Sequence, residues 1–399
     1  MASNTRGRGP TLAKDMNRKL IYGELKRRRE TTRTELAAAL GLNKNTVNAI
    51  VDELMEAGYA RATGLREGGG AGRKALGIAF EPANRRAFGF QLAAGSLVAV
   101  VTDLYGSPLE RTELPLRAAA PADVVAAAAS FARARLAAAP EGTYVGAGLG
   151  VPAVVDPAGE RVVRSTHLGW TDVPLRAMLA DALPLRHTLI DNAVKLATQG
   201  ELWYGAGQGL KHFAYCSFGR GVGCGIVVDG NVVRGEAGFA GELGHTVVEP
   251  LGPRCECGNE GCLEAVAGLP GVFGRLSAAT GEPASAFDAA VLAARARAGD
   301  PAVLAELDRV GRAIGAALAG IVNLINARRI VFDGPLLLAA DALLPVVRRE
   351  LRRNSLAPAF EQAELVVSSL QPLSSAIGAA AGIVRAWEHQ ADPLEPISL

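Results

Sequence analysis

The apolar residues near the start of the chain recur every three or four positions, which is the period of a helix. This spacing predicts a first helix over residues 11–29. A shorter helix is expected from Thr34 to Gly41, where glycine breaks it. A third helix follows Asn43, a preferred N-cap residue, and stops at Gly58. Its apolar face consists of Val47, Ile50, Val51, Leu54 and Met55.

The second and third helices meet the size and backbone constraints of a helix-turn-helix that begins at Arg33. Ala37 is small enough to let two helices cross closely, and Gly41 allows the left-handed backbone that the turn needs. Val47 and Ile50 stand at inward-facing positions. This agreement predicts a DNA-binding motif, and the alternative is a helix-turn-helix that contacts protein.

Two strand-like runs follow the third helix, at residues 59–63 and 75–80, and a glycine-rich basic segment joins them. This hairpin fits the wing of a winged helix-turn-helix, so we assign residues 11–80 to a DNA-binding domain. Residues 1–10 have no periodic pattern and are expected to form a disordered arm. Residues 81–86 are expected to be a linker.

The remaining residues, 87–399, alternate strand-like and helical patterns, which indicates an α/β body. Two segments typical of glycine-turn hairpins, 88–106 and 212–233, each precede helical stretches. The body is therefore expected to contain two similar halves. Further helices are predicted at residues 121–138, 191–205, 301–326 and 374–389, and a further strand at 328–334.

Composition places the chain among globular proteins, since 49% of its 399 residues are hydrophobic and 21% are charged. No apolar run reaches the roughly 18 residues of a membrane span, and no secretory signal follows Met1. Five cysteines, an odd number, favour a reducing compartment over a disulfide framework. We therefore expect a cytoplasmic protein without a membrane partner.

The net charge of +2 conceals an asymmetry along the chain. Residues 1–75 contain 15 Lys and Arg against 8 Asp and Glu, a net charge of +7, whereas the remainder contains 27 against 32, a net charge of −5. A basic end on a mildly acidic body indicates a nucleic-acid-binding module. The alternative is a basic tail that is simply solvated.

The exposed start of the third helix carries the residue types that read base edges in the major groove. Lysine recognises guanine and asparagine recognises adenine, while other contacts of this helix reach only phosphate. A basic pair in the wing is suited to the minor groove. The candidate DNA contacts are Arg33, Thr34, Lys44, Asn45, Thr46, Asn48, Arg73 and Lys74.

One histidine and three cysteines have the spacing of a metal site. His245 is followed by Cys255, Cys257 and Cys262, and nearby glycines allow the tight turn that brings three sulfurs together. Three thiolates and one imidazole satisfy tetrahedral Zn²⁺, and a site with all four positions filled is structural rather than catalytic. The alternative is three unpaired cysteines in a loop. The other two cysteines are expected to be buried small hydrophobes.

The segment AGELGHTVVEPLGPRCECGNEGCLE, residues 240–264, resembles the signature of the ROK family of repressors, open reading frames and sugar kinases. GAGLGVPAVVD, residues 146–156, is similar to the glycine/proline segment at the edge of that family's sugar cleft. The winged helix, with GRK at 72–74 where family regulators usually have GRP, resembles the repressor branch. The resemblance covers the chain from about residue 12. It implies a winged helix-turn-helix followed by a two-lobed, actin-like α/β body of the ribonuclease-H-like type.

The resemblance also implies a sugar site. Glu242 and Glu264 match residues that accept sugar hydroxyls, and His245 matches one that binds zinc and touches the sugar. Asn192 matches the asparagine of an Asn-Asp pair. Without the resemblance, the two glutamates are equally well explained as partners of the zinc ligands.

Four departures from the kinases of the family argue against phosphoryl transfer. Ala193 stands where those enzymes have the aspartate general base, and alanine accepts no proton. Residues 91–95 lack the DxGGT phosphate loop, and DGP at 333–335 stands where the kinases have a glycine run. In the second phosphate loop Arg220 replaces a threonine. Arg220 either pairs with the phosphate of an effector or, as we favour, fills the vacated nucleotide site between the lobes.

We therefore expect a transcriptional regulator, a repressor of carbohydrate-related genes, that is not an enzyme. Its partners would be a pseudo-palindromic operator in double-stranded DNA, a sugar or sugar-phosphate effector, and itself as a homodimer or homotetramer. One alternative is a sugar kinase with a DNA-binding arm. Another is a ligand-blind regulator whose body only oligomerises.

Overall fold

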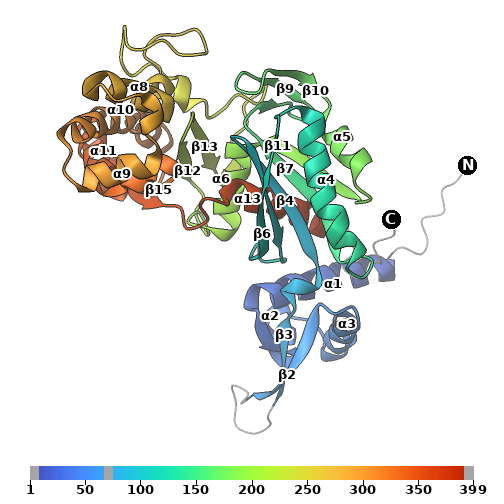
Figure 1. Cartoon of the computed structure of the whole chain (residues 1–399). Helices are drawn as coiled ribbons and strands as arrows, with labels where there is room; N and C mark the ends of the chain where they lie inside the picture. Colours follow the sequence, from blue (N-terminus) through green and yellow to red (C-terminus); the bar gives the residue numbers. More distant parts are fainter. Residues whose placement is uncertain (1–8, 67–74, 391–399) are drawn as a thin grey trace, which may run out of the picture.

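The computed structural model describes residues 9–66 and 75–390 (Figure 1). All three helices and the hairpin predicted at the N-terminal end are present, together with a short strand that the sequence pattern did not indicate. The elements are α1 (Gly9–Arg28), β1 (Glu30–Thr32), α2 (Arg33–Leu40), α3 (Lys44–Glu56), β2 (Ala60–Arg66) and β3 (Ala75–Phe80). The strands pair antiparallel in the order β1-β3-β2, so the wing is a three-stranded sheet.

Helix α2 begins at Arg33, one residue before the predicted start, because Thr32 caps it. The Thr32 hydroxyl accepts the Glu35 N–H, and the Glu35 carboxylate accepts the Thr32 N–H. This reciprocal capping box satisfies two helix-end donors, and its T-x-x-E pattern is readable in the sequence. Gly41 takes a left-handed φ of 63°, and Asn43 caps α3, as predicted.

Two five-stranded sheets form the body, and they share one topology (Figure 1). In each sheet the first three strands form an antiparallel meander, and the last two add parallel to the first strand. The two similar halves expected from the sequence are thus present. The first sheet contains β4 (Arg86–Ala93), β5 (Ser96–Thr102), β6 (Pro108–Pro115), β7 (Tyr144–Val151) and β11 (His187–Asn192). The second contains β12 (Phe213–Phe218), β13 (Val222–Val228), β14 (Asn231–Val232), β15 (Arg329–Asp333) and β16 (Glu364–Val367).

Helices cover both faces of each sheet. None of the described helices is long and apolar enough to cross a membrane. The outer face of the first sheet packs on α4 (Pro121–Ala137) and α5 (Leu175–Ala182). A smaller sheet of β8 (Val154–Val155), β9 (Val162–Ser165) and β10 (Trp170–Val173) flanks this lobe. The outer face of the second sheet packs on α7 (Leu263–Ala267), α8 (Leu269–Thr280), α9 (Ala289–Arg297), α10 (Pro301–Ile325), α11 (Ala340–Asn354) and α12 (Ala357–Gln362). Short 3₁₀ turns lie at η1 (Pro82–Asn84), η2 (Leu243–His245), η3 (Ala284–Ala286) and η4 (Pro335–Ala339).

Two helices, α6 (Ala193–Tyr204) and α13 (Ser374–Gln390), lie between the two sheets and pack on each other (Figure 1). A side chain on Gly378 of α13 would collide with the backbone carbonyl of Leu196 in α6. Glycine therefore permits the close approach of these helices. Helix α6 covers the second sheet, whereas α13 covers the first although it is the last helix of the chain.

The winged domain shares one apolar core with the first lobe. Tyr59 of the winged domain stacks on Trp387 of α13 with ring centroids 6.1 Å apart. The Tyr22 hydroxyl and the Lys26 ammonium both bond to the Glu388 carboxylate, at 2.9 and 2.6 Å. The predicted linker is correspondingly short, because β4 already begins at Arg86. Gly9 and Pro10, which we assigned to the disordered arm, begin α1 instead, and residues 1–8 of the predicted arm lie outside the described part of the chain.

Candidate functional site

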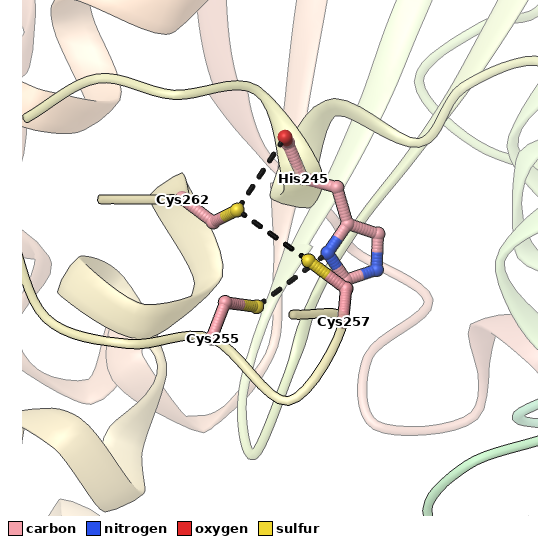
Figure 2. Close-up of side chains that lie close together, drawn as sticks. All are labelled: His245, Cys255, Cys257 and Cys262. Carbon is pink, nitrogen blue, oxygen red and sulfur yellow. Dashed lines mark hydrogen bonds between the residues drawn. The ribbon is translucent and has the colours of Figure 1, made fainter. Parts of the chain in front are cut away.

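The four predicted metal ligands converge on one point (Figure 2). The ligand atoms of His245, Cys255, Cys257 and Cys262 all lie within 4.8 Å of one another. The Cys257 and Cys262 sulfurs are 3.7 Å apart, as are the Cys255 sulfur and His245 Nδ1. A tetrahedron with metal–sulfur bonds of about 2.3 Å has edges of about 3.8 Å, so these two distances fit a cluster that could hold a metal ion.

Backbone turns of the loop hold the cysteines in place. The Cys255 N–H donates to the Asn259 carbonyl, and the Gly258 N–H donates back to the Cys255 carbonyl. Gly258 and Gly261 have φ of 103° and 76°, and a side chain on Gly261 would collide with the Glu249 carbonyl. The glycines noted in the sequence are thus required by the turn itself.

The Nδ1 atom of His245 lies against the Cys255 sulfur, and its other ring nitrogen, Nε2, lies 3.9 Å from the Glu242 carboxylate. Burial raises the pKa of the Cys262 thiol to about 12 and also raises that of Cys255, whereas a backbone hydrogen bond from Asn259 lowers that of Cys257. Binding of a metal would therefore displace protons from these sulfurs. The remaining cysteines, Cys216 and Cys224, are buried in the second sheet, as expected.

The other predicted effector contacts already have partners within the protein. The Asn192 side chain caps α6 by accepting the Val194 and Lys195 N–H groups, and it donates to the Ala153 carbonyl at 2.9 Å. The Glu264 carboxylate accepts the Val222 N–H at 2.9 Å. A sugar would have to share or replace these hydrogen bonds.

An ionic group beside Asn192 was not predicted from the sequence. Asp191 pairs with Arg234 at 2.5 Å, and the buried Lys195 ammonium donates to the Gly238 carbonyl. Burial lowers the pKa of Lys195, and Asp191 and Glu242 oppose that shift. Lys195 lies three residues after Asn192, on the same face of α6, which is a signal that helical periodicity could have supplied.

Arg220, which we favoured as filling the vacated nucleotide site, is not among the residues that line the cavity between the lobes. It lines a cavity of about 420 Å³ beside the metal loop, together with Glu264 and with His167 of the first lobe. A separate cavity of about 540 Å³ lies between the lobes. Gln91, Ala193 and Asp333 line that second cavity, so the structure brings together three of the four positions that depart from the kinase pattern.

The start of α3 forms an exposed polar surface on the winged domain. Lys44, Asn45 and Asn48 are exposed, and Thr46 is half-buried. Thr34 is also exposed, at the start of α2. The opposite face of α3 packs inward through Val47, Ile50, Val51 and Leu54, which have at most 1% of their surface exposed. The helix therefore presents its predicted DNA contacts outward from a rigid base.

Arg33 is the exception among the predicted DNA contacts. Its guanidinium bonds to the Asp52 carboxylate at 2.5 Å and to the Asn48 carbonyl at 3.1 Å. It thereby ties the first turn of α2 to the exposed side of α3. Arg73 and Lys74 lie outside the described residues.

Two family models match the chain. One described as ROK family matches residues 89–385, and one described as winged helix-turn-helix DNA-binding matches residues 15–61. A xylose repressor of Bacillus spizizenii is 26% identical over 385 residues, covering 96% of this chain and 97% of the repressor. A glucokinase of Halalkalibacterium halodurans is 33% identical over 246 residues, covering 59% of this chain and 74% of the kinase.

A solved structure also resembles the chain along its length. It is described as a ROK family transcriptional regulator, a homolog of the Escherichia coli MLC protein. The TM-score is 0.78 at 27% identity, and the match covers 96% of this chain and 98% of the other. The similarity thus extends over the winged domain and both lobes.

Proposed function

The chain belongs to the ROK family, and from that premise we propose that it is a DNA-binding transcriptional regulator that represses carbohydrate-related genes. One observation carries the proposal. The similarity to the xylose repressor spans 96% of the chain, winged domain included, whereas the similarity to the glucokinase spans 59%. The exposed polar start of α3 supplies a surface suited to the major groove.

The operator would be a pseudo-palindrome. Two winged domains of a homodimer would occupy half-sites about one helical turn apart, with α3 in the major groove of each. Lys44, Asn45, Thr46 and Asn48 would contact DNA from α3, and Thr34 from the start of α2. Arg73 and Lys74 would act from the wing. Arg33 would act chiefly by positioning α3, because its guanidinium is already paired with Asp52.

The body would sense a sugar or sugar phosphate at the edge of the lobes. Asn192, Glu242, His245 and Glu264 would supply the hydroxyl contacts, since amides and carboxylates give the directional hydrogen bonds that a polyol needs. Zn²⁺ held by His245, Cys255, Cys257 and Cys262 would keep this loop ordered. With four protein ligands the role is structural.

Phosphoryl transfer is not part of the proposal. Ala193 supplies no general base, and the buried Asp333 carboxylate lines the cavity where a nucleotide would lie. The protein would then act only by binding. An effector must bind the DNA-competent and DNA-incompetent states differently, with a typical coupling of about 1–3 kcal/mol.

Selection of bound fragments from the source genome by the purified protein tests the DNA-binding function. We expect a short palindromic motif beside transport or glycoside genes. The double variant N45A/N48A should lose the motif, while K211A, an exposed lysine of the body, should retain it. Retention without a shared motif, disappearing as salt rises, would mean backbone electrostatics only and would contradict the proposal.

A sugar kinase remains the second candidate because of the 33% identity to a glucokinase. Incubation of the protein with Mg·ATP and a panel of sugars tests it. We expect no sugar phosphate above the level of a protein-free control. Product that disappears when Glu242 is replaced by Gln would establish the kinase instead.

A further inference from the structure

The metal-loop cavity, the cavity of about 420 Å³ that Arg220 lines, is bounded by both lobes. His167 lies in the turn between β9 and β10 of the first lobe, and its Nδ1 atom is 3.3 Å from the Glu256 carboxylate of the metal loop. Glu264, one of the predicted sugar contacts, also lines the cavity. A volume of this size is typical of small-molecule sites. A ligand here would therefore touch both lobes and a predicted sugar contact at once.

Part of the cavity wall carries no polar side chain. Pro253, Ala265 and Pro270 line it, and so do Gly271 and Gly274 of α8. A side chain on Gly274 would meet no atom within 4 Å, so the glycine leaves this side of the cavity open. Apolar surface of this kind can pack against the C–H face of a sugar ring, while a few polar groups fix the orientation of the ring.

Four arginines line the cavity: Arg220, Arg254, Arg275 and Arg309. Two of them are held by carboxylates outside the cavity lining. Arg275 donates to Glu306 at 2.9 and 2.6 Å, and Arg309 donates to Glu249 at 3.0 and 2.6 Å. Each of these two guanidiniums is therefore neutralised by its own partner and fixed in place.

Arg220 and Arg254 are the two remaining arginines. Both are exposed, and neither forms an ion pair or a side-chain hydrogen bond within the described residues 9–66 and 75–390. A guanidinium presents two parallel N–H donors that match the two oxygens of a carboxylate. Glu256 and Glu264 also line the cavity, so a phosphate dianion would meet more repulsion there than a carboxylate monoanion. The charges of the cavity therefore favour a ligand with one negative charge.

We propose that the metal-loop cavity binds the carboxylate of an acidic carbohydrate, so that the effector is a sugar acid rather than a neutral sugar or a sugar phosphate. Arg220 and Arg254 hold the carboxylate, and Glu264 accepts a hydroxyl of the same ring. The prolines pack against the ring, and His167 brings the first lobe to the ligand. Glu264 acts here as a sugar contact of the proposed function, on which this assignment rests.

Calorimetric titration of the full-length protein tests the assignment, with D-glucuronate and D-galacturonate as probes. D-Glucose and D-galactose are their neutral counterparts, the two hexose 6-phosphates are their dianionic counterparts, and acetate supplies a carboxylate without a sugar. We expect at least one uronate to bind about tenfold or more tightly than its hexose and its hexose 6-phosphate, because it gains charge-assisted hydrogen bonds without the added repulsion. Acetate should show no saturable binding.

R220Q removes one guanidinium and keeps a polar side chain. Loss of one charge-assisted hydrogen bond corresponds to about a tenfold change in affinity, so R220Q should weaken uronate binding about tenfold. The affinity of R220Q for the neutral hexose should stay within about twofold of wild type, which a general disruption of the site would not allow.

R352Q is the matched control. Arg352 is also exposed and free of ion pairs within the described part of the chain, but it lies on α11 outside the cavity. R352Q should bind the uronate as wild type does.

Any of three results would contradict the assignment. Neither uronate binds more tightly than its hexose, acetate or a hexose 6-phosphate binds as tightly as the uronate, or a folded R220Q keeps full uronate affinity. If R220Q does not fold, R254Q replaces it with the same expected loss, and unchanged uronate affinity in R254Q would contradict the assignment. DNA binding is tested separately by the operator selection. Uronate binding by a protein that retains no operator would support this cavity assignment and contradict the DNA-binding function instead.

Discussion

The winged domain and the cleft between the lobes place their polar side chains in opposite ways. On the winged domain, Lys44, Asn45 and Asn48 project into solvent from one short helix. In the cleft, Asn192 and Glu264 bond to backbone groups of other segments. The first surface is already exposed to a binding partner. A ligand of the second must share or replace hydrogen bonds that already join segments within each lobe.

The two regions are nevertheless connected through one helix. Helix α13 begins at the inter-lobe cavity with Ser374 and Ser375, and its last turns carry Trp387 and Glu388 into the core of the winged domain. Its 17 residues span about 25 Å at 1.5 Å per residue. Substitutions in each region measure how independent the two regions are.

The largest effect is expected from W387A, which removes the side chain shared by the two regions. Trp387 is 2% exposed, and truncation of a buried aromatic residue costs about 3–5 kcal/mol. Chemical denaturation should show this loss, with the winged domain unfolding in a separate first transition. W170A, whose buried ring belongs to the separate core of the first lobe, should keep a single transition. Separate unfolding in both variants would contradict the shared core.

The next effect concerns the metal loop beside the cleft. C257S should reduce bound zinc, measured by elemental analysis, from one ion per chain to none, because one of four ligands is lost. The binding free energy of structural zinc is typically about 10–16 kcal/mol, so an equal share for each of four ligands is roughly 3 kcal/mol. The C257S protein should lose its response to an effector before its intrinsic affinity for DNA declines, because the winged domain lies away from the metal loop.

The control for that experiment is C224A, which alters a buried cysteine outside the ligand cluster. It should retain its zinc. Unchanged metal content in C257S would refute the assignment of the ligands.

A smaller effect is expected from K44A on the exposed surface. Removal of one phosphate contact should weaken binding of all DNA sequences alike and reduce the salt dependence, d log K/d log[salt], by about 0.9. Titrations at several salt concentrations measure both quantities. Loss of affinity for the operator alone would instead make Lys44 a base-reading residue. K211A should change neither quantity.

The smallest effect is expected from D52N, which breaks the ion pair with Arg33. Exposed pairs of this kind contribute about 0.2–1 kcal/mol to the free energy of unfolding. The Arg33 hydrogen bond lowers the pKa of Asp52 below 3.8. The stabilisation is therefore complete above that value and is lost as the pH falls through the folded-state pKa. Denaturation at pH 7 should separate D52N from wild type, and the difference should diminish under strongly acidic conditions.

D52N also distinguishes two roles for Arg33. If Arg33 only positions α3, D52N should weaken operator binding slightly. If the freed guanidinium contacts DNA, binding should strengthen.

Elements that depend on neighbouring residues could be predicted from the sequence. Ala37, Gly41 and the apolar face of α3 define the helix-turn-helix, because helix period, cap and turn act within about twenty residues. The convergence of His245 and the three cysteines could be predicted for the same reason, since His245 and Cys262 are 17 residues apart and the glycines between them permit the turn. The repeated hairpins likewise indicated the two lobes.

Long-range packing was decided only by the tertiary structure. The sequence did not show that α13 covers the first sheet, that Trp387 reaches Tyr59, or that Arg33 is paired with Asp52. Nor did it show that Gln91 and Ser375, 284 residues apart, line one cavity. Hydrophobic burial is non-directional, so an apolar face states that a helix must pack but not against what. Only the assembled lobes determine which polar groups are left to bind a ligand.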